Sequence, residues 1–218
     1  MAKTPCRLLL VTLLLAGCSS GAPLGVTSPP AAETTPFSSP LPEAQPQPTP
    51  ASQVPAPADC PATLTPAQME GPYYTAGSPE RPVLVEPGIP GEPLLVTGVV
   101  MNSNCEPIAG ARVDFWQADG AGEYDNTGYQ LRGHQFTGPD GSYHLETVIP
   151  GVYPGRTPHI HVKIFASDGR ELLTTQLYLA GISEQIPDSL FNATLLARDE
   201  EPDPTGRRRS SFDFVVGE

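Results

Sequence analysis

Two histidines, two residues apart, give this sequence its most specific chemical signal. They are His159 and His161 in the run Pro158-His159-Ile160-His161. Residues two apart on a β-strand point to the same face of the sheet, so both imidazoles would face one point. Imidazole nitrogens are common metal ligands, and the spacing therefore predicts a metal site. By itself the pair is a weak signal, because it also suits the polar face of an exposed strand.

Four short motifs precede the histidine pair. They read Val-Asp-Phe-Trp-Gln-Ala-Asp at residues 113–119, Gly-Glu-Tyr at 122–124, Gly-Pro-Asp-Gly-Ser-Tyr at 138–143 and Pro-Gly-Val-Tyr-Pro-Gly-Arg at 150–156. In their order and local spacing they resemble the intradiol ring-cleavage dioxygenases, the family of catechol 1,2-dioxygenase and protocatechuate 3,4-dioxygenase. The resemblance runs from about residue 70 to the C-terminus and is strongest between residues 113 and 178.

The resemblance implies one non-haem Fe(III) per chain, bound by two tyrosines and two histidines. By motif position the ligands are Tyr124, Tyr153, His159 and His161. It further implies a catechol-type substrate that binds the iron through both oxygens and displaces Tyr153, which can then accept a substrate proton. With O2 the ring would open to a cis,cis-muconate-type diacid.

Three further elements match the active site of this family. Arg156 lies three residues before the histidine pair and matches its arginine, and Gln176 lies fifteen residues after it and matches its glutamine. Both side chains are suited to stabilise negative charge that develops on the substrate. The element Gly71-Pro72-Tyr73 resembles the Gly-Pro-aromatic sequence that lines the substrate pocket.

The chemistry of the ligand set agrees with iron in the ferric state. A free phenol ionises near pH ~10, so tyrosine is an anionic ligand at neutral pH only beside a strongly charged hard cation. Two phenolates and one hydroxide would neutralise a trivalent ion, and two neutral imidazoles would complete five-coordination. The Fe(II) facial triad instead uses two histidines and one carboxylate, and no carboxylate stands at that spacing beside His159.

Two other functions stay open on the sequence. One is a non-catalytic extracytoplasmic binding lipoprotein built on a β-sandwich, and the other is a zinc-dependent hydrolase that uses the histidine pair. Neither would require Arg156, Gln176 and both tyrosines together. The formal net charge of −12 argues against a nucleic-acid partner. We expect the acidic run 119–125 to be a solvated loop, His144 to face solvent, and Arg207-Arg208-Arg209 to form a surface turn.

The N-terminus has the three parts of a secretory signal. Lys3 and Arg7 precede an apolar run over residues 8–16, which is too short to span a bilayer, and small residues follow it. The sequence Leu-Ala-Gly-Cys ending at Cys18 resembles the bacterial lipobox, in which the cysteine is acylated and becomes the new N-terminus. We therefore expect a lipid-anchored protein outside the cytoplasm, on the outer membrane if the cell has one.

The chain divides into three parts by composition. Residues 1–17 are the expected lipoprotein signal peptide. Residues 18–59 are rich in Pro, Ala, Ser and Thr, and up to Ala58 their charged side chains are Glu33 and Glu43. Such a segment cannot bury a core, so we predict a disordered spacer that holds the rest of the protein off the membrane. Residues 60–218 are long enough for one catalytic domain.

Cysteine use agrees with an oxidising compartment. Cys6 would leave with the signal peptide and Cys18 would be acylated, which leaves Cys60 and Cys105 as an even pair. We expect a disulfide between them; two buried free thiols are the alternative.

The domain reads as an all-β β-sandwich. Its apolar segments are short, rich in β-branched residues and separated by turn signals such as Pro139-Asp140-Gly141. The expected strands cover residues 94–101, 111–117, 142–148, 159–165, 172–179 and 212–216. Residues 189–197 could form one or two helical turns. The long helical dimerisation region of typical catechol 1,2-dioxygenases has no counterpart in this chain, so the oligomeric state is open.

The lipobox can be tested by substitution of its cysteine. We expect Cys18→Ser to move the protein from the membrane fraction to the soluble fraction, because acyl chains provide the attachment. Fractionation of cells that express either form measures this. Unchanged partitioning would reject the lipobox.

Overall fold

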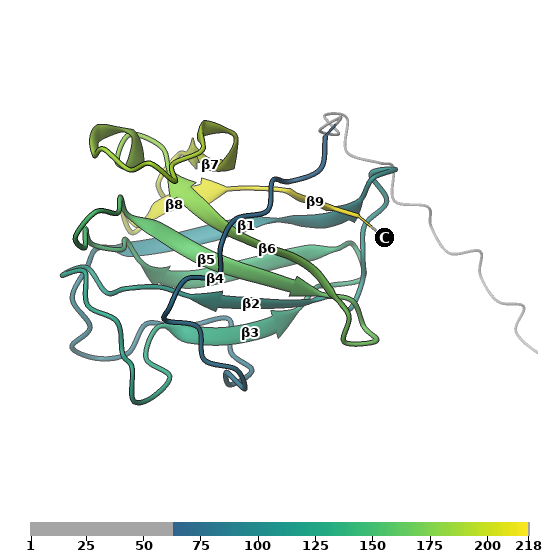
Figure 1. Cartoon of the computed structure of the whole chain (residues 1–218), viewed down its shortest axis with the longest axis horizontal. Coiled ribbons are helices and arrows are strands. Elements are labelled where there is room, and N and C mark those ends of the chain that lie inside the picture. The colour runs from purple at the N-terminus through teal and green to yellow at the C-terminus, as the bar shows by residue number, and fades with distance from the viewer. Residues whose placement is uncertain (1–62, 218) are drawn as a thin grey trace, which may run out of the picture. The chain divides into compact units, whose positions relative to one another are not determined.

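The structure is a computed structural model that describes residues 63–217. This part of the chain forms nine strands and two short 3-10 helices (Figure 1). In chain order the elements are β1 (Pro93–Asn102), β2 (Arg112–Trp116), β3 (Arg132–Phe136), β4 (Ser142–Val148), β5 (His159–Phe165), β6 (Glu171–Leu179), η1 (Ser183–Gln185), η2 (Ala193–Leu195), β7 (Leu196–Glu200), β8 (Arg208–Ser211) and β9 (Phe214–Val216).

The strands form two layers that share β7. One layer has the order β3-β2-β5-β6 and the other has the order β8-β1-β4, while β9 continues along β1. Strand β7 pairs with β6 over only two positions and with β8 over three, so it joins the layers at one side. Side chains from both layers fill the core between them, and the predicted β-sandwich is confirmed.

Strand β5 has one apolar face and one face that carries the two histidines. Its residues from His159 to Ile164 are all buried. Ile160, Val162 and Ile164 belong to the core cluster between the layers, and the histidines alternate with them. Because successive strand residues point to opposite faces, His159 and His161 lie on the outer face of this layer.

The register of four strands brings one row of side chains together on that outer face. His161 pairs with Trp116 of β2 on one side and with Gln176 of β6 on the other, and Trp116 pairs in turn with Arg132 of β3. Each of the four residues is at most 1% exposed. We call Arg132, Trp116, His161 and Gln176 the cross-sheet row.

An extended segment covers the cross-sheet row from outside. Gln176 donates from Nε2 to the carbonyl of Met69 at 3.0 Å, and Arg132 donates from Nη1 to the carbonyl of Tyr73. Between these two contacts, Gly71 lies so close to His161 that a β-carbon on it would be 3.2 Å from Cε1 of the ring. Residues 69–73 therefore cross the row from β6 to β3 and exclude solvent from it.

The six expected strands are present as β1, β2, β4, β5, β6 and β9. Strands β3, β7 and β8 were not expected, because their sequences are largely polar and show no apolar alternation. The expected surface turn at 207–209 is wrong, since Arg208 begins β8. Its guanidinium forms an ion pair with Asp199. The helical expectation at 189–197 is met only by η2. His144 is exposed, as expected.

The signal peptide (1–17), the spacer (18–59), Cys18 and Cys60 lie outside the described residues. No helix within residues 63–217 is long and apolar enough to cross a membrane. Cys105 is buried in the turn after β1 and is disulfide-bonded. Its partner lies outside the described residues, so the pairing with Cys60 stays a prediction.

The pairing can be tested by peptide mapping. Without reductant we expect one linked peptide that contains Cys60 and Cys105, and we expect Cys105→Ser to lower the free energy of unfolding by about 2 to 4 kcal/mol, because the closed loop limits the unfolded chain. Recovery of Cys60 as an alkylated free thiol would contradict the pairing.

Candidate metal centre

The two histidines converge through the same ring atom. Their Nε2 atoms are 3.1 Å apart and their rings stand at 74° to each other. Nδ1 of His159 donates to the carbonyl of Thr157 at 2.6 Å, which fixes the tautomer and leaves a lone pair on Nε2. Burial lowers the pKa of His159 to about 4 and holds the pKa of His161 well below its usual value. Both rings are therefore neutral and can act as ligands.

Tyr153 is brought to the histidines by a tight turn. In Tyr153-Pro154-Gly155-Arg156 the amide of Arg156 donates to the carbonyl of Tyr153 at 3.0 Å, and Gly155 has a φ of 80°. Proline in the second position and glycine at positive φ in the third are typical of a type II turn. The turn places Tyr153 and Arg156 side by side, with Nη1 of the arginine 3.3 Å from the tyrosine hydroxyl.

Tyr124 is held by a loop that packs on the residue before Tyr153. Gly122 is required there, because a β-carbon on it would be 2.2 Å from the carbonyl oxygen of Val152. Asp119 accepts hydrogen bonds from the amides of Ala121 and Glu123 and closes the loop. The expectation of a solvated loop over residues 119–125 is wrong for its first residue, because Asp119 is buried.

The hydroxyl of Tyr124 is buried and has no hydrogen-bond partner among residues 63–217. Its ring centroid is 5.7 Å from that of Tyr153 and 6.4 Å from that of His161. Burial raises the pKa of Tyr124 and of Tyr153, so each hydroxyl stays protonated unless a cation replaces the proton. A buried polar group without a partner costs about 1–3 kcal/mol, which a bound cation would remove.

These four side chains fit a metal ion that accepts oxygen and nitrogen donors together. Two phenol oxygens and two neutral imidazoles supply the donor set, and the unpartnered hydroxyl supplies a free coordination direction. Within the described part of the chain, no group of three or more His, Cys, Asp or Glu side chains could hold a metal ion instead. A centre in this region therefore depends on the tyrosines.

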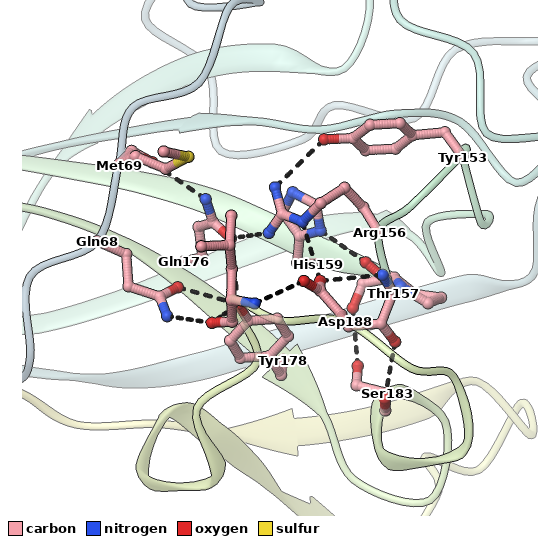
Figure 2. Close-up of polar contacts among 12 residues, drawn as sticks. Gln68, Met69, Tyr153, Arg156, Thr157, His159, Gln176, Tyr178, Ser183 and Asp188 are labelled. Atoms are coloured by element: carbon pink, nitrogen blue, oxygen red, sulfur yellow. Dashed lines mark hydrogen bonds and ion pairs between the residues drawn. The ribbon is translucent and has the colours of Figure 1, made fainter.

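A partly buried arginine, Arg156, lies between Tyr153, Gln176 and Asp188 (Figure 2). Arg156 donates from Nε to Asp188 at 2.9 Å and from Nη2 to the side-chain oxygen of Gln176. The carboxylate of Asp188 is fully buried and also accepts the amide of Thr157 at 3.1 Å. Burial alone would lower the pKa of Arg156, but the hydrogen bond that it donates to Asp188 raises its pKa above the usual value. The cation is thus permanent and fixed in place.

Comparison with known proteins agrees with this geometry. The family model described as Dioxygenase matches residues 69–216. This chain belongs to the intradiol dioxygenase family. Hydroxyquinol 1,2-dioxygenase of Nocardioides simplex is 31% identical over 189 residues, which cover 70% of this chain and 64% of the relative. The chain spans between 45% and 64% of the length of three curated relatives that it matches, all named as hydroxyquinol-type dioxygenases.

Solved structures show the same fold. The dioxygenase domain of a dioxygenase carbohydrate-binding protein fusion from Streptomyces sp. SirexAA-E is 50% identical, with a TM-score of 0.66 over 71% of this chain and 99% of that chain. An intradiol ring-cleavage dioxygenase from Tetranychus urticae is 27% identical, with a TM-score of 0.64 over 71% of this chain and 95% of that chain.

The structure of this intradiol dioxygenase family member brings together every site residue expected within the described region. The rings of the four expected ligands are neighbours, with centroids 4.7–6.4 Å apart, and Arg156 contacts both Tyr153 and Gln176. The expected pocket element Gly71-Pro72-Tyr73 also reaches the centre. The ring of Tyr73 stacks on Tyr124 at 4.3 Å and meets Tyr153 edge-on. The roles of these residues stay predictions, since their positions alone do not test them.

Sequence reasoning missed the residues that orient the site from a distance. Asp188, which holds Arg156, follows a proline and accepts the amide of Leu190, so its sequence signal indicates only a turn. Trp116 stacks on His161 with ring centroids 4.8 Å apart and planes 7° apart. In the sequence, Trp116 is recognisable only as part of the family motif at 113–119. Arg132 carried no sequence signal at all.

Proposed function

We propose that this protein is a non-haem Fe(III) intradiol dioxygenase that opens catechol-type rings with O2 and forms cis,cis-muconate-type diacids. The observation that carries the proposal is that the rings of Tyr124 and Tyr153 lie beside the histidine pair, while the buried Tyr124 hydroxyl has no hydrogen-bond partner among residues 63–217. Family membership adds that relatives are named as catechol and hydroxyquinol dioxygenases.

Tyr124, Tyr153, His159 and His161 would hold the iron. Two phenolates favour the ferric ion, because only a hard and highly charged cation keeps phenols ionised in a buried site at neutral pH. When bound, Fe(III) would supply Lewis-acid chemistry and a template on which both oxygens of the diol are held. Thr157 would orient His159 through its carbonyl, which is the usual arrangement behind a metal-bound imidazole.

The residues around the ligands have separate tasks. Tyr153 is half-buried, and in its phenolate form, as an iron ligand, its oxygen could accept a proton from a substrate hydroxyl. Arg156 places a fixed positive charge beside that oxygen, where it stabilises negative charge on the ring oxygen of the substrate. Gln176 holds the far side of the guanidinium, and Tyr73 offers a flat aromatic wall for a planar ring.

The zinc-hydrolase alternative is less well supported. Catalytic zinc sites take three protein ligands from His, Cys and carboxylates, and residues 63–217 contain no such group. A binding module would have no use for an ion pair between Arg156 and the buried carboxylate of Asp188, which costs desolvation free energy to maintain. We also propose that the reaction takes place outside the cytoplasm, on a membrane to which Cys18 attaches the chain; the fractionation described above tests this.

Metal content and oxygen uptake test the proposed function. We expect the purified protein to contain about one iron per chain, to absorb visible light through tyrosinate-to-iron charge transfer, and to consume O2 with at least one catechol. Tyr153→Phe should weaken the absorption because one phenolate is lost, and His161→Ala should lose iron and activity. Catechol, hydroxyquinol, chlorocatechol and protocatechuate form the substrate panel. A colourless zinc protein, or no O2 uptake with the whole panel, would overturn the proposal.

Replacement of Arg156 separates iron binding from catalysis. We expect Arg156→Ala to keep iron and colour, because it is not a ligand, and to lower ring-opening turnover by about 10²-fold or more, the scale for loss of one preorganised charge-stabilising group. Arg207→Ala is the matched control, since this arginine pairs with Asp203 and Glu146. An iron-loaded Arg156→Ala protein with wild-type turnover would contradict the assigned role.

A further inference from the structure

Arg132 is a buried cation that the proposed reaction does not use. It stands at the β3 end of the cross-sheet row and is 1% exposed. Within residues 63–217 it forms no ion pair, whereas Arg156 at the other end pairs with Asp188. Burial of an unpaired charge is costly, so a fold keeps it only where its hydrogen bonds are needed.

The hydrogen bonds of Arg132 go to two backbone carbonyls from distant parts of the chain. Nη1 donates to the carbonyl of Tyr73, and Nε and Nη2 donate to the carbonyl of Asp125 at 3.1 and 2.7 Å. Tyr73 belongs to the segment that covers the row, and Asp125 directly follows Tyr124. One guanidinium thus binds the backbone of the pocket wall and the backbone of a proposed iron ligand.

We propose that Arg132 is a positioning residue for the metal centre, which sets where the Tyr124 oxygen lies by joining the Tyr124 loop to the Tyr73 segment. This inference rests on the proposed function. The Tyr124 hydroxyl has no hydrogen-bond partner in the described region, so no hydrogen bond from residues 63–217 fixes that end of the side chain. The ring is placed instead by its stack on Tyr73 and by the guanidinium of Arg132, 6.0 Å from its centroid.

The two proposed tyrosine ligands are therefore oriented by different arginines. Arg156 reaches the hydroxyl of Tyr153 directly, whereas Arg132 acts on Tyr124 through the backbone. A planar guanidinium suits this task, because its fixed fork of donors can bind two carbonyls at a defined separation. Arg132 is itself rigid, since β3 pairs with β2 at this residue and Nε of Arg81 donates to its carbonyl at 3.1 Å.

Substitutions at Arg132 in the full-length, iron-loaded protein test the inference. We expect Arg132→Gln to keep iron but to shift the tyrosinate-to-iron absorption band, and to lower kcat/KM by about 10-fold to 100-fold, the scale for a small misplacement of a reacting group. Arg132→Lys keeps the charge but cannot bind both carbonyls, so it should not restore the band or the kinetics. Arg208→Gln is the control; its side chain also donates to a backbone carbonyl, that of Ala180, but it pairs with Asp199 and contacts neither Tyr73 nor Asp125.

A second variant acts on the same loop from the solvent side. The carboxylate of Asp125 accepts the amides of Thr127, Gly128 and Gln130, so Asp125→Ala loosens the loop without removing the buried arginine. We expect it to shift the band in the same direction as Arg132→Gln. If Arg132→Gln folds, the double variant should show a smaller effect than the sum of the two, because both act through one loop. If Arg132→Gln does not fold, the band of Asp125→Ala decides.

The outcomes separate this inference from the proposed function. A wild-type protein without iron or colour overturns both. An iron-loaded wild type beside an iron-loaded Arg132→Gln with the same band, kcat and KM, and only a lower melting temperature, overturns the positioning role alone. Restoration by Arg132→Lys, or an unchanged band in Asp125→Ala, does the same.

Discussion

The strand register around β5 is the constraint on which the metal centre depends. Ile160, Val162 and Ile164 bury their side chains between the layers, and this burial fixes which face each neighbour takes. A slip by one residue would turn His159 and His161 into the core and bring the isoleucines out. Apolar burial, at about 25 cal/mol per Å² of apolar surface, thus decides the position of polar ligands that contribute little to the stability of the core.

Burial sets the protonation states of the candidate centre. Desolvation lowers the pKa values of the two imidazoles and raises those of the two phenols. All four side chains are therefore uncharged at neutral pH when no metal is bound. A metal ion that binds there displaces the phenolic protons and supplies the charge that the phenolates need. Arg156 and Arg132 add positive charge beside the two tyrosines. Binding of an anionic ligand set and of an electron-rich diol is therefore favoured over binding of a neutral one.

What the sequence predicted depends on how local each signal is. The His-x-His spacing acts within three residues and could be interpreted from residue type alone, whereas the segment 153–156 is recognisable only as part of a short motif of the family. Asp188 and Arg156 are 32 residues apart in the sequence, and Arg132 and Tyr73 are 59 apart. No local sequence pattern therefore predicts either contact. The polar strands β3 and β8 were missed for the same reason. They form strands because neighbouring strands provide hydrogen-bond partners for their backbone. The intrinsic β-propensity of their residues does not reflect this.

The site lies on the outer face of the sheet, where a single extended segment covers it. Unlike the packed interior, this face has backbone carbonyls that can accept hydrogen bonds from polar side chains. Residues 69–73 cross the cross-sheet row and present free backbone carbonyls to it, at Met69 for Gln176 and at Tyr73 for Arg132. An apolar core could satisfy neither side chain. Between these two anchors, Gly71 allows the backbone to approach His161 closely enough to exclude water. One short covering segment therefore provides the hydrogen-bond acceptors, the dry environment and the aromatic wall at once, and the two ends of the row hold it in place.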